Sequence, residues 1–229
     1  MARPADPNAK KALVAAARAE FARKGLVGAR VEDITSACGL SKGSFYLHFQ
    51  SKEALFGELV EAFNAVVTEC AERHQQAMFD FVGRFGAVTR RDMAERSPRY
   101  QAFLETEASE DLRVLEAMWE YRDVVGVLLR GAQGTRFEGA IWTMTDREVD
   151  RIKDNFDQFQ GQHACRTDIP PEIFASTYVG TYLLLGMRMS RMAEKPDLAE
   201  WARSLNMLIR EGSVPVDETT AAPDSGRDS

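Results

Sequence analysis

Apolar residues recur every three to four positions along almost the whole chain, and this spacing predicts α-helices. In the first helix, expected over about residues 8–24, one face carries Leu13, Val14, Ala17 and Phe21. No segment alternates apolar and polar residues between turn signals, so no β-sheet is expected. The pattern therefore predicts an all-α fold.

Glycine and serine mark the expected ends of the next helices. Gly25 suits the left-handed position after the first helix, with Leu26 closing back onto Phe21. A second helix is expected over residues 31–38, ending at Gly39. A third and a fourth helix are expected to begin after two serines that serve as N-caps, at positions 41 and 51.

The rest of the chain is also predicted to be helical. The fourth helix is expected to be long, with Leu55, Leu59 and Phe63 toward a core. The further helices are expected over residues 77–90, from 100 after a break at Ser97-Pro98, over 109–130, from a capping box at 145–148, over 168–191 and over 197–210. Residues 213–229 are rich in Asp, Glu, Thr, Ser, Ala and Pro, which predicts a disordered tail. The expected parts are therefore an N-terminal domain over 8–52, a larger domain over 53–212 and a tail over 213–229.

Length and composition exclude several classes of protein. The chain has 229 residues with 16 Gly and 8 Pro, which excludes collagen-like and low-complexity sequences. The longest apolar stretch, residues 173–187, is too short to span a bilayer, and the N-terminus has no apolar core typical of a signal peptide. The 3 cysteines show no paired spacing, which favours a reducing cytoplasm over a disulfide-bonded fold.

Charge is distributed unevenly along the chain. Residues 1–52 hold nine Lys and Arg against four Asp and Glu, so they carry a charge of +5. The remainder carries −11, and the two parts together give the formal net charge of −6. A basic N-terminal segment on an acidic body is typical of a domain that binds a polyanion such as DNA. An ordinary solvated surface can show the same excess of basic residues, so sequence motifs are needed to distinguish it from a DNA-binding domain.

The residues between the second and third predicted helices form a helix-turn-helix pattern. Gly39 permits a sharp reversal, Leu40 can fill the angle between the helices, and Ser41 caps the helix that follows. Phe45 and Phe49 lie one turn apart and are expected to pack against the first helix, which leaves the opposite face of the third helix free. A plain helical hairpin in a bundle remains an alternative for this geometry.

The free face of the third helix fits a DNA major groove. Gly43 allows close approach of the backbone, Ser44 can bond a base edge, and Leu47 can touch a thymine methyl group. Tyr46, His48 and Lys52 flank this face and suit phosphate oxygens. The predicted DNA-binding residues are Arg30, Ser41, Lys42, Gly43, Ser44, Tyr46, Leu47, His48 and Lys52.

Residues 8–63 resemble the TetR family of bacterial regulators. The resemblance is carried by Phe21-Ala22-Arg23-Lys24-Gly25, Asp33-Ile34, Gly39-Leu40-Ser41-Lys42-Gly43-Ser44-Phe45-Tyr46, His48-Phe49 and Ser51-Lys52-Glu53-Ala54-Leu55, in order and at the spacing of the family. It implies a homodimeric transcriptional repressor that a small molecule releases from a palindromic operator. Two positions depart from the family pattern: Ala29-Arg30 stands where a capping Thr or Ser is usual, and Thr35 stands where alanine is usual.

The body of such a protein is expected to hold an effector and to dimerise. The aromatic and Met-rich lining available predicts an apolar or amphipathic effector with few buried charges around it. The candidate ligand-binding residues are Met118, Trp119, Phe137, Trp142, Phe156, Tyr178 and Tyr182, with the loop over 131–144 bordering the cavity. Dimerisation is expected through the last two helices, by way of Ser176, Gly180, Leu183, Trp201, Leu205 and Leu208.

Two functions of other classes stay open as alternatives. One is a helical scaffold that binds protein partners, and the other is an enzyme that works through His163 and Cys165, for which no orienting partner is evident. We expect no catalytic residue, no cofactor and no metal site. Cys38 is interpreted as a small buried residue, and His74 as part of a solvated helix face.

Overall fold

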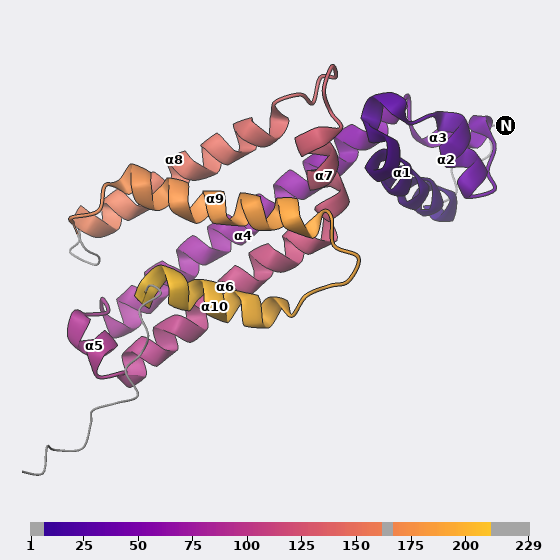
Figure 1. Ribbon diagram of the computed structural model, residues 1–229. Helices are drawn as coiled ribbons and strands as arrows, with labels where there is room; N and C mark the ends of the chain where they lie inside the picture. The colour runs from indigo at the N-terminus through magenta and orange to yellow at the C-terminus, as the bar shows by residue number, and fades with distance from the viewer. Residues whose placement is uncertain (1–6, 162–166, 212–229) are drawn as a thin grey trace, which may run out of the picture.

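The computed structural model describes residues 7–161 and 167–211, and every secondary-structure element in these ranges is an α-helix (Figure 1). The helices are α1 (Pro7–Gly28), α2 (Val31–Ala37), α3 (Lys42–His48), α4 (Lys52–Phe85), α5 (Arg90–Ala94), α6 (Pro98–Glu120), α7 (Arg122–Arg130), α8 (Ala140–Gly161), α9 (Pro171–Met189) and α10 (Leu198–Glu211). The all-α prediction is confirmed. The predicted tail over 213–229 lies outside the described residues, and the boundary at residue 52 stays a prediction.

Helices α1, α2 and α3 form a small bundle at one end of the molecule, from which α4 leads into the body (Figure 1). We call this bundle the head. Its helices begin and end close to the predicted residues because their signals are local. The Ser41 and Ser51 side chains accept hydrogen bonds from the backbone N–H groups of Ser44 and Ala54, both at 3.1 Å.

Helix α4 is a single helix of 34 residues, where the sequence predicted a break near residue 77. No glycine or proline lies near that point, since the first glycine after Gly57 is Gly83. The helix ends at Phe85, and Gly86 follows it with a φ of 75°, in the left-handed region that glycine adopts without steric cost. The predicted helix over 77–90 is therefore wrong, and its residues mostly extend α4.

The predicted helix over 109–130 is also wrong, because two helices meet at Tyr121. Helix α6 begins at Pro98, capped by Ser97, and Ser109 lies in its interior. It ends at Glu120, and α7 follows after the bend. Arg18 of the head bonds both sides of this bend, the Glu120 carbonyl and the Asp123 carboxylate, and so holds it in place.

Helix α8 begins at Ala140, five residues before the predicted capping box. The Thr145 hydroxyl donates to the carbonyl of Ile141 at 2.8 Å, as a threonine inside a helix does, so it caps nothing. The predicted loop over 131–144 is correspondingly shorter. The helices predicted over 168–191 and 197–210 are confirmed as α9 and α10, with ends that differ by a few residues.

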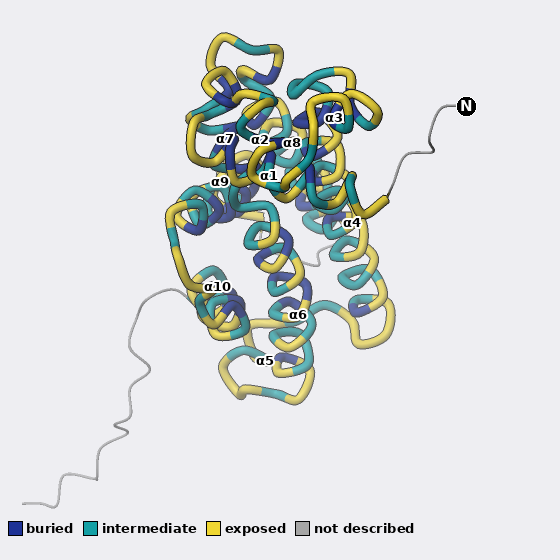
Figure 2. The backbone as a smooth tube through the Cα atoms, turned by 90° about the vertical axis from the view of Figure 1, so that its right-hand side faces the viewer, coloured by how far each residue is buried: buried dark blue, intermediate teal, exposed yellow. Residues whose placement is uncertain are grey.

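The head and the adjoining end of the body share one hydrophobic core. Leu13, Phe21 and Phe45 of the head belong to the same buried cluster as Val124 of α7 and Phe137 of the following loop. A second cluster joins α6, α9 and α10 farther from the head. In Figure 2 the α1, α2 and α7 segments gather at one end, and α9 and α10 form one side of the body. The head therefore packs directly onto α7.

Two glycines meet where the head contacts α7. Gly25 adopts φ 69° and interrupts α1, which confirms the left-handed position predicted for it. The backbone N–H of Leu26 donates to the carbonyl of Gly131 at 2.9 Å. A Cβ added at Gly131 would lie 3.0 Å from the Cα of Gly25, so the two backbones approach closely only because both residues are glycine.

Candidate functional site

The turn between α2 and α3 has the geometry that the sequence predicted. Gly39 adopts φ 68°, and the backbone N–H of Leu40 donates to the carbonyl of Thr35 at 2.9 Å, which closes the reversal. Ser41 then caps α3. The local residues therefore fix how α3 projects from the head.

Helix α3 has one buried and one exposed face. Phe45 and Phe49 are buried, at 0% and 3% exposed, and belong to the core of the head as predicted. On the other side, the Tyr46 and Leu47 side chains are 57% and 60% exposed. Gly43 is exposed as well, and a Cβ added there would meet only the Ser41 Oγ, at 3.6 Å. We call the outward side of α3 the reading face.

Three more of the predicted DNA-binding residues belong to α2 and α3 or directly precede them. Arg30 is exposed at the N-cap of α2, and its side chain makes no capping bond, as the departure from the family pattern predicts. Lys42 forms an ion pair with Glu32 of α2, and that hydrogen bond lowers the pKa of the Glu32 carboxyl. His48 is half-buried beside the ring of Phe49.

Lys52 has a structural role that the sequence did not reveal. Its Nζ donates to the carbonyls of Val27 at 2.9 Å and Ala29 at 2.8 Å, and the side chain is only 20% exposed. The Val27 carbonyl lies in the last turn of α1, and the Ala29 carbonyl lies in the connection between α1 and α2. Lys52 therefore fastens the start of α4 to this connection, in addition to the phosphate contact predicted for it.

The body contains adjoining cavities between α4, α6, α8 and α9. The central cavity has a volume of about 180 Å³, and a smaller one of about 90 Å³ shares His74, Arg151, Ile152 and Tyr178 with it. A groove of about 720 Å³ between α5, α9 and α10 shares several lining residues with the central cavity, among them Phe103, Phe156, Phe174, Tyr178 and Arg210. The three spaces together run through much of the body.

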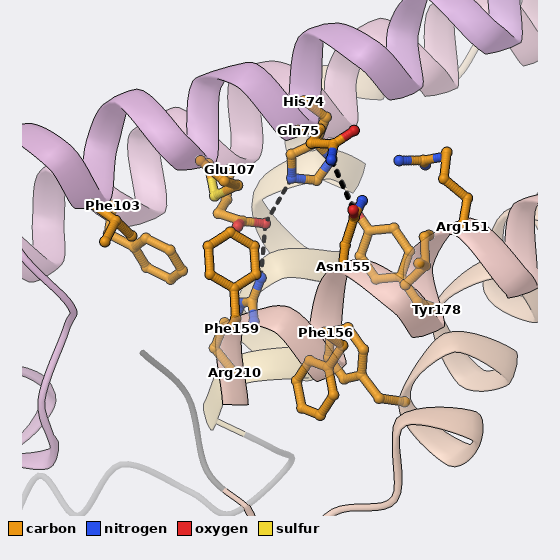
Figure 3. Close-up of a pocket in the computed structure, with 14 residues that line it drawn as sticks. His74, Gln75, Phe103, Glu107, Arg151, Asn155, Phe156, Phe159, Tyr178 and Arg210 are labelled. Atoms are coloured by element: carbon orange, nitrogen blue, oxygen red, sulfur yellow. Dashed lines mark hydrogen bonds and ion pairs between the residues drawn. The ribbon is translucent and has the colours of Figure 1, made fainter. Parts of the chain in front are cut away.

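Charged residues line the central cavity (Figure 3). The Arg210 Nη2 lies 2.8 Å from the Glu107 Oε2, and the His74 Nε2 lies 3.5 Å from the same oxygen. Burial alone would raise the pKa of Glu107, but Arg210 and His74 outweigh it and hold the pKa at about 2. Burial lowers the pKa of His74, but the hydrogen bond that its ring N–H donates to Glu107 outweighs this and raises the pKa above its usual value.

The polar cluster continues behind the cavity wall. The hydroxyls of Tyr178 and Tyr182 donate to the same oxygen of Asp111 at 2.8 and 2.5 Å, and the Tyr178 hydroxyl lies 3.4 Å from the His74 Nδ1. Burial and the neighbouring Glu107 raise the pKa of Asp111. The expectation of few buried charges is therefore wrong, and so is the solvated position predicted for His74.

Four of the candidate ligand-binding residues line the central or the smaller cavity, namely Met118, Phe156, Tyr178 and Tyr182. The other three do not. Trp119 lies at a separate surface groove, Phe137 packs against Phe56 near the head at 5.0 Å between ring centroids, and Trp142 is 56% exposed on α8. The glycine-rich segment after α7 therefore serves the contact with the head, and only its α8 end borders a cavity.

The predicted dimerisation residues divide in the same way. Leu205 is buried in the second cluster, against which the half-buried Trp201 packs, and the half-buried Leu183 packs against the cluster shared with the head. Leu208 is 56% exposed, Ser176 is exposed, and no atom of the described residues lies within 4 Å of a Cβ added at Gly180. Exposed apolar residues of α9 and α10 that the sequence did not single out are Ile173, Leu184 and Met207.

The sequence contained a signal for the buried acids of α6 that was missed. Tyr100, Phe103 and Leu115 form an apolar stripe on this helix, and Glu107 and Asp111 fall on the same stripe at helical spacing. Charged residues on a buried stripe indicate a paired polar cluster. Their partners lie on other helices and only the fold identifies them.

The remaining predictions concern cysteines, a membrane span and a metal site. Cys38 is half-buried at the end of α2, its thiol 3.4 Å from the carbonyl of Ile34. His163 and Cys165 lie outside the described residues. Within 7–161 and 167–211, no helix is long and apolar enough to cross a membrane, and no group of three or more His, Cys, Asp or Glu is placed to hold a metal ion.

Comparison with known proteins places the head in a family. Residues 13–59 match the model of the bacterial regulatory proteins of the tetR family. The uncharacterized HTH-type transcriptional regulator YdgC of Bacillus subtilis is 43% identical over 63 residues, which are 28% of this chain and 32% of YdgC. The HTH-type transcriptional repressor DhaR of a Mycobacterium species is 49% identical over 43 residues, 19% of this chain and 22% of DhaR. The chain thus covers less than a third of each relative.

Similarity in fold extends over most of the chain. The tetR-family transcriptional regulator PfmR of Thermus thermophilus superposes with a TM-score of 0.63 at 18% sequence identity, covering 89% of this chain and 99% of PfmR. The body is therefore similar to known structures in the arrangement of its helices, while its residues differ.

Proposed function

We propose that this chain, which belongs to the tetR family of bacterial regulatory proteins, is a transcriptional repressor that binds a palindromic operator as a homodimer and leaves it when a small molecule occupies the body. The observation that carries the proposal is the reading face of α3, where Tyr46 and Leu47 are exposed opposite the buried Phe45. Exposing an aromatic and a leucine side by side is unfavourable in water unless a partner covers them. A DNA major groove admits a helix of this size.

Operator binding tests the first part of the proposal. The probe is the DNA that flanks the coding region of the protein, searched for a palindrome, with a scrambled duplex of the same composition as the control. Ser44→Ala and Leu47→Ala should lower affinity for the palindrome by about 1–3 kcal/mol and change affinity for scrambled DNA much less, since base contacts specify the site. Phe85→Ala, at the far end of α4, is the matched control and should change neither.

Dimerisation through α9 and α10 is part of the same proposal. It is supported by exposed Leu184 and Leu208 and by the open space around Gly180. Gly180→Arg should give a monomer in sedimentation and reduce operator affinity, because two heads are needed to span two half-sites. Gly83→Arg, at another open helical position, should remain a dimer. A Gly180→Arg protein that is still a dimer at micromolar concentration would place the interface elsewhere.

The cavities of the body are proposed as the effector site. An effector releases DNA only if it binds one arrangement of the two heads more tightly than the other. The proposal predicts that a small apolar or amphipathic compound raises the melting temperature of the protein and lowers its operator affinity together. A screen of such compounds by thermal shift, followed by operator titration, tests this link.

A further inference from the structure

We propose that the central cavity selects an apolar molecule that carries one carboxylate, and that Arg210 binds this carboxylate. The proposal rests on the proposed effector role of the cavity and names the chemical class of the ligand. It starts from an unsatisfied group. Among residues 7–161 and 167–211, the buried Arg210 Nε has no hydrogen-bond partner, although this residue lines both the cavity and the groove beside it.

The guanidinium of Arg210 is held in place on two sides. Glu107 accepts a hydrogen bond from its Nη2 at 2.8 Å, and the ring of Phe103 lies 5.1 Å from the Cζ. In Figure 3 Arg210 and His74 converge on Glu107 from opposite sides. The orientation of the Nε is therefore fixed before a ligand arrives, and a buried N–H without a partner is unfavourable until an acceptor reaches it.

The charges around the central cavity favour an acid over a base. Three basic side chains line it, His74, Arg151 and Arg210, and its acid is Glu107. Glu107 already contacts Arg210 and His74. Asp111 does not line the central cavity, and it accepts hydrogen bonds from two tyrosines. A ligand ammonium would therefore meet cations, whereas a carboxylate would meet an oriented donor and a positive surrounding.

The side chains that line the cavity indicate which chemical group the rest of the ligand carries. Phe156 and Phe174 are stacked with 4.1 Å between ring centroids, and Phe159 and Ile152 complete an apolar lining. Arg210 lines both the cavity and the groove, so a carboxylate bound to it lies where the two spaces adjoin and the apolar body can occupy the cavity. A phenyl ring or a short alkyl chain suits this arrangement.

The test compares three molecules that differ only in their polar group: 4-phenylbutyrate, 4-phenylbutanamide and 4-phenylbutylamine, with octanoate as a second acid. Binding is measured by calorimetry on the full chain without DNA. We expect an acid to bind at least about tenfold more tightly than the amide and the amine, as a charge-assisted hydrogen bond provides. Equal binding of acid and amide, tighter binding of the amine, or no binding of either acid below 1 mM would overturn the assignment.

Two variants separate the role of Arg210 in binding the carboxylate from its role in folding. Arg210→Lys keeps the charge and the pairing with Glu107 but removes the Nε, so the preference for acid over amide should fall to about threefold or less. Glu107→Gln removes the competitor for the guanidinium, so acid binding should become tighter. Thermal melts of both variants verify that they fold. An unchanged acid preference in Arg210→Lys would refute the proposal.

Operator titration with the same compounds distinguishes this proposal from the function on which it rests. An acid that binds and leaves operator affinity unchanged supports the site and contradicts its effector role. Operator release by the neutral or basic compound alone supports the effector role and overturns the carboxylate assignment.

Discussion

Replacing Gly131 by alanine tests the contact between the head and α7. The added Cβ would lie 3.0 Å from the Cα of Gly25, closer than the roughly 3.5–4.0 Å at which carbon atoms pack. This Cα is a backbone atom of the head, so relief of the contact requires that the head moves away from α7. That movement would also stretch the 2.9 Å hydrogen bond from Leu26 to Gly131.

The expected cost follows from these two effects. Forcing a methyl group into a filled space costs about 1–3 kcal/mol, and weakening the hydrogen bond adds about 1 kcal/mol. The free energy of unfolding should therefore fall by about 2–4 kcal/mol. Because the head is displaced, operator affinity should fall as well. Urea unfolding followed by circular dichroism at fixed protein concentration, together with an operator titration, measures both quantities.

Gly83→Ala is the matched control for this substitution. Gly83 lies in α4 with nothing within 4 Å of an added Cβ, so alanine there should stabilise the protein by about 0.5–1 kcal/mol through helix propensity alone. If Gly131→Ala unfolds at the same urea concentration as the native chain and binds the operator equally well, the two backbones do not meet as described.

Three further changes address other parts of the molecule. Gly43→Ala should leave the melting temperature equal or slightly higher, since the new Cβ meets only the Ser41 Oγ at 3.6 Å, yet it should weaken operator binding by blocking backbone approach. Lys52→Ala should lower the urea midpoint, because two hydrogen bonds to backbone carbonyls are lost. It should also reduce the slope of log affinity for DNA against log salt concentration by about one unit per monomer. His74, whose pKa is raised above 6.5, contributes stability that is complete below pH 6.5 and lost as the pH rises through its raised pKa, so His74→Gln should flatten the loss of stability above pH 6.5.

Each of these has an outcome that contradicts it. A Gly43→Ala protein with native operator affinity would mean that the α3 backbone stays away from the DNA. An unchanged urea midpoint for Lys52→Ala would remove its structural role, and an unchanged salt slope would remove its phosphate contact. A His74→Gln variant that loses stability with pH as the native chain does would show that another group titrates in this range.

The head could be predicted in detail because its signals are local. Gly39, Ser41 and Ser51 act within four residues of their positions, and the pair Phe45 and Phe49 identifies the buried face from spacing alone. The same locality led to errors in the body. The pattern Thr145 to Glu148 occurs inside a helix as readily as at its start, and only the hydrogen bond of Thr145 to Ile141 decides between these cases.

The polar cluster of the body could not be predicted because its members come from distant parts of the chain. His74, Glu107 and Arg210 lie on α4, α6 and α10. On its own helix His74 has the surroundings of a solvent-exposed residue. The stability of a charge in the interior depends on its partner, and the partner is a property of the fold.

Because α4 is one continuous helix, a small tilt at its Phe85 end produces a larger displacement of the head at its other end. A helix of 34 residues is roughly 50 Å long at about 1.5 Å per residue, with the head at one end and the wall of the cavity along its second half. A tilt of only about 5° about the Phe85 end would therefore carry the Lys52 end through about 4 Å. Two such helices in a dimer would shift their heads by about a quarter of the roughly 34 Å between successive major grooves. Small changes in packing around His74 would thus be magnified into a mismatch with the periodicity of the double helix.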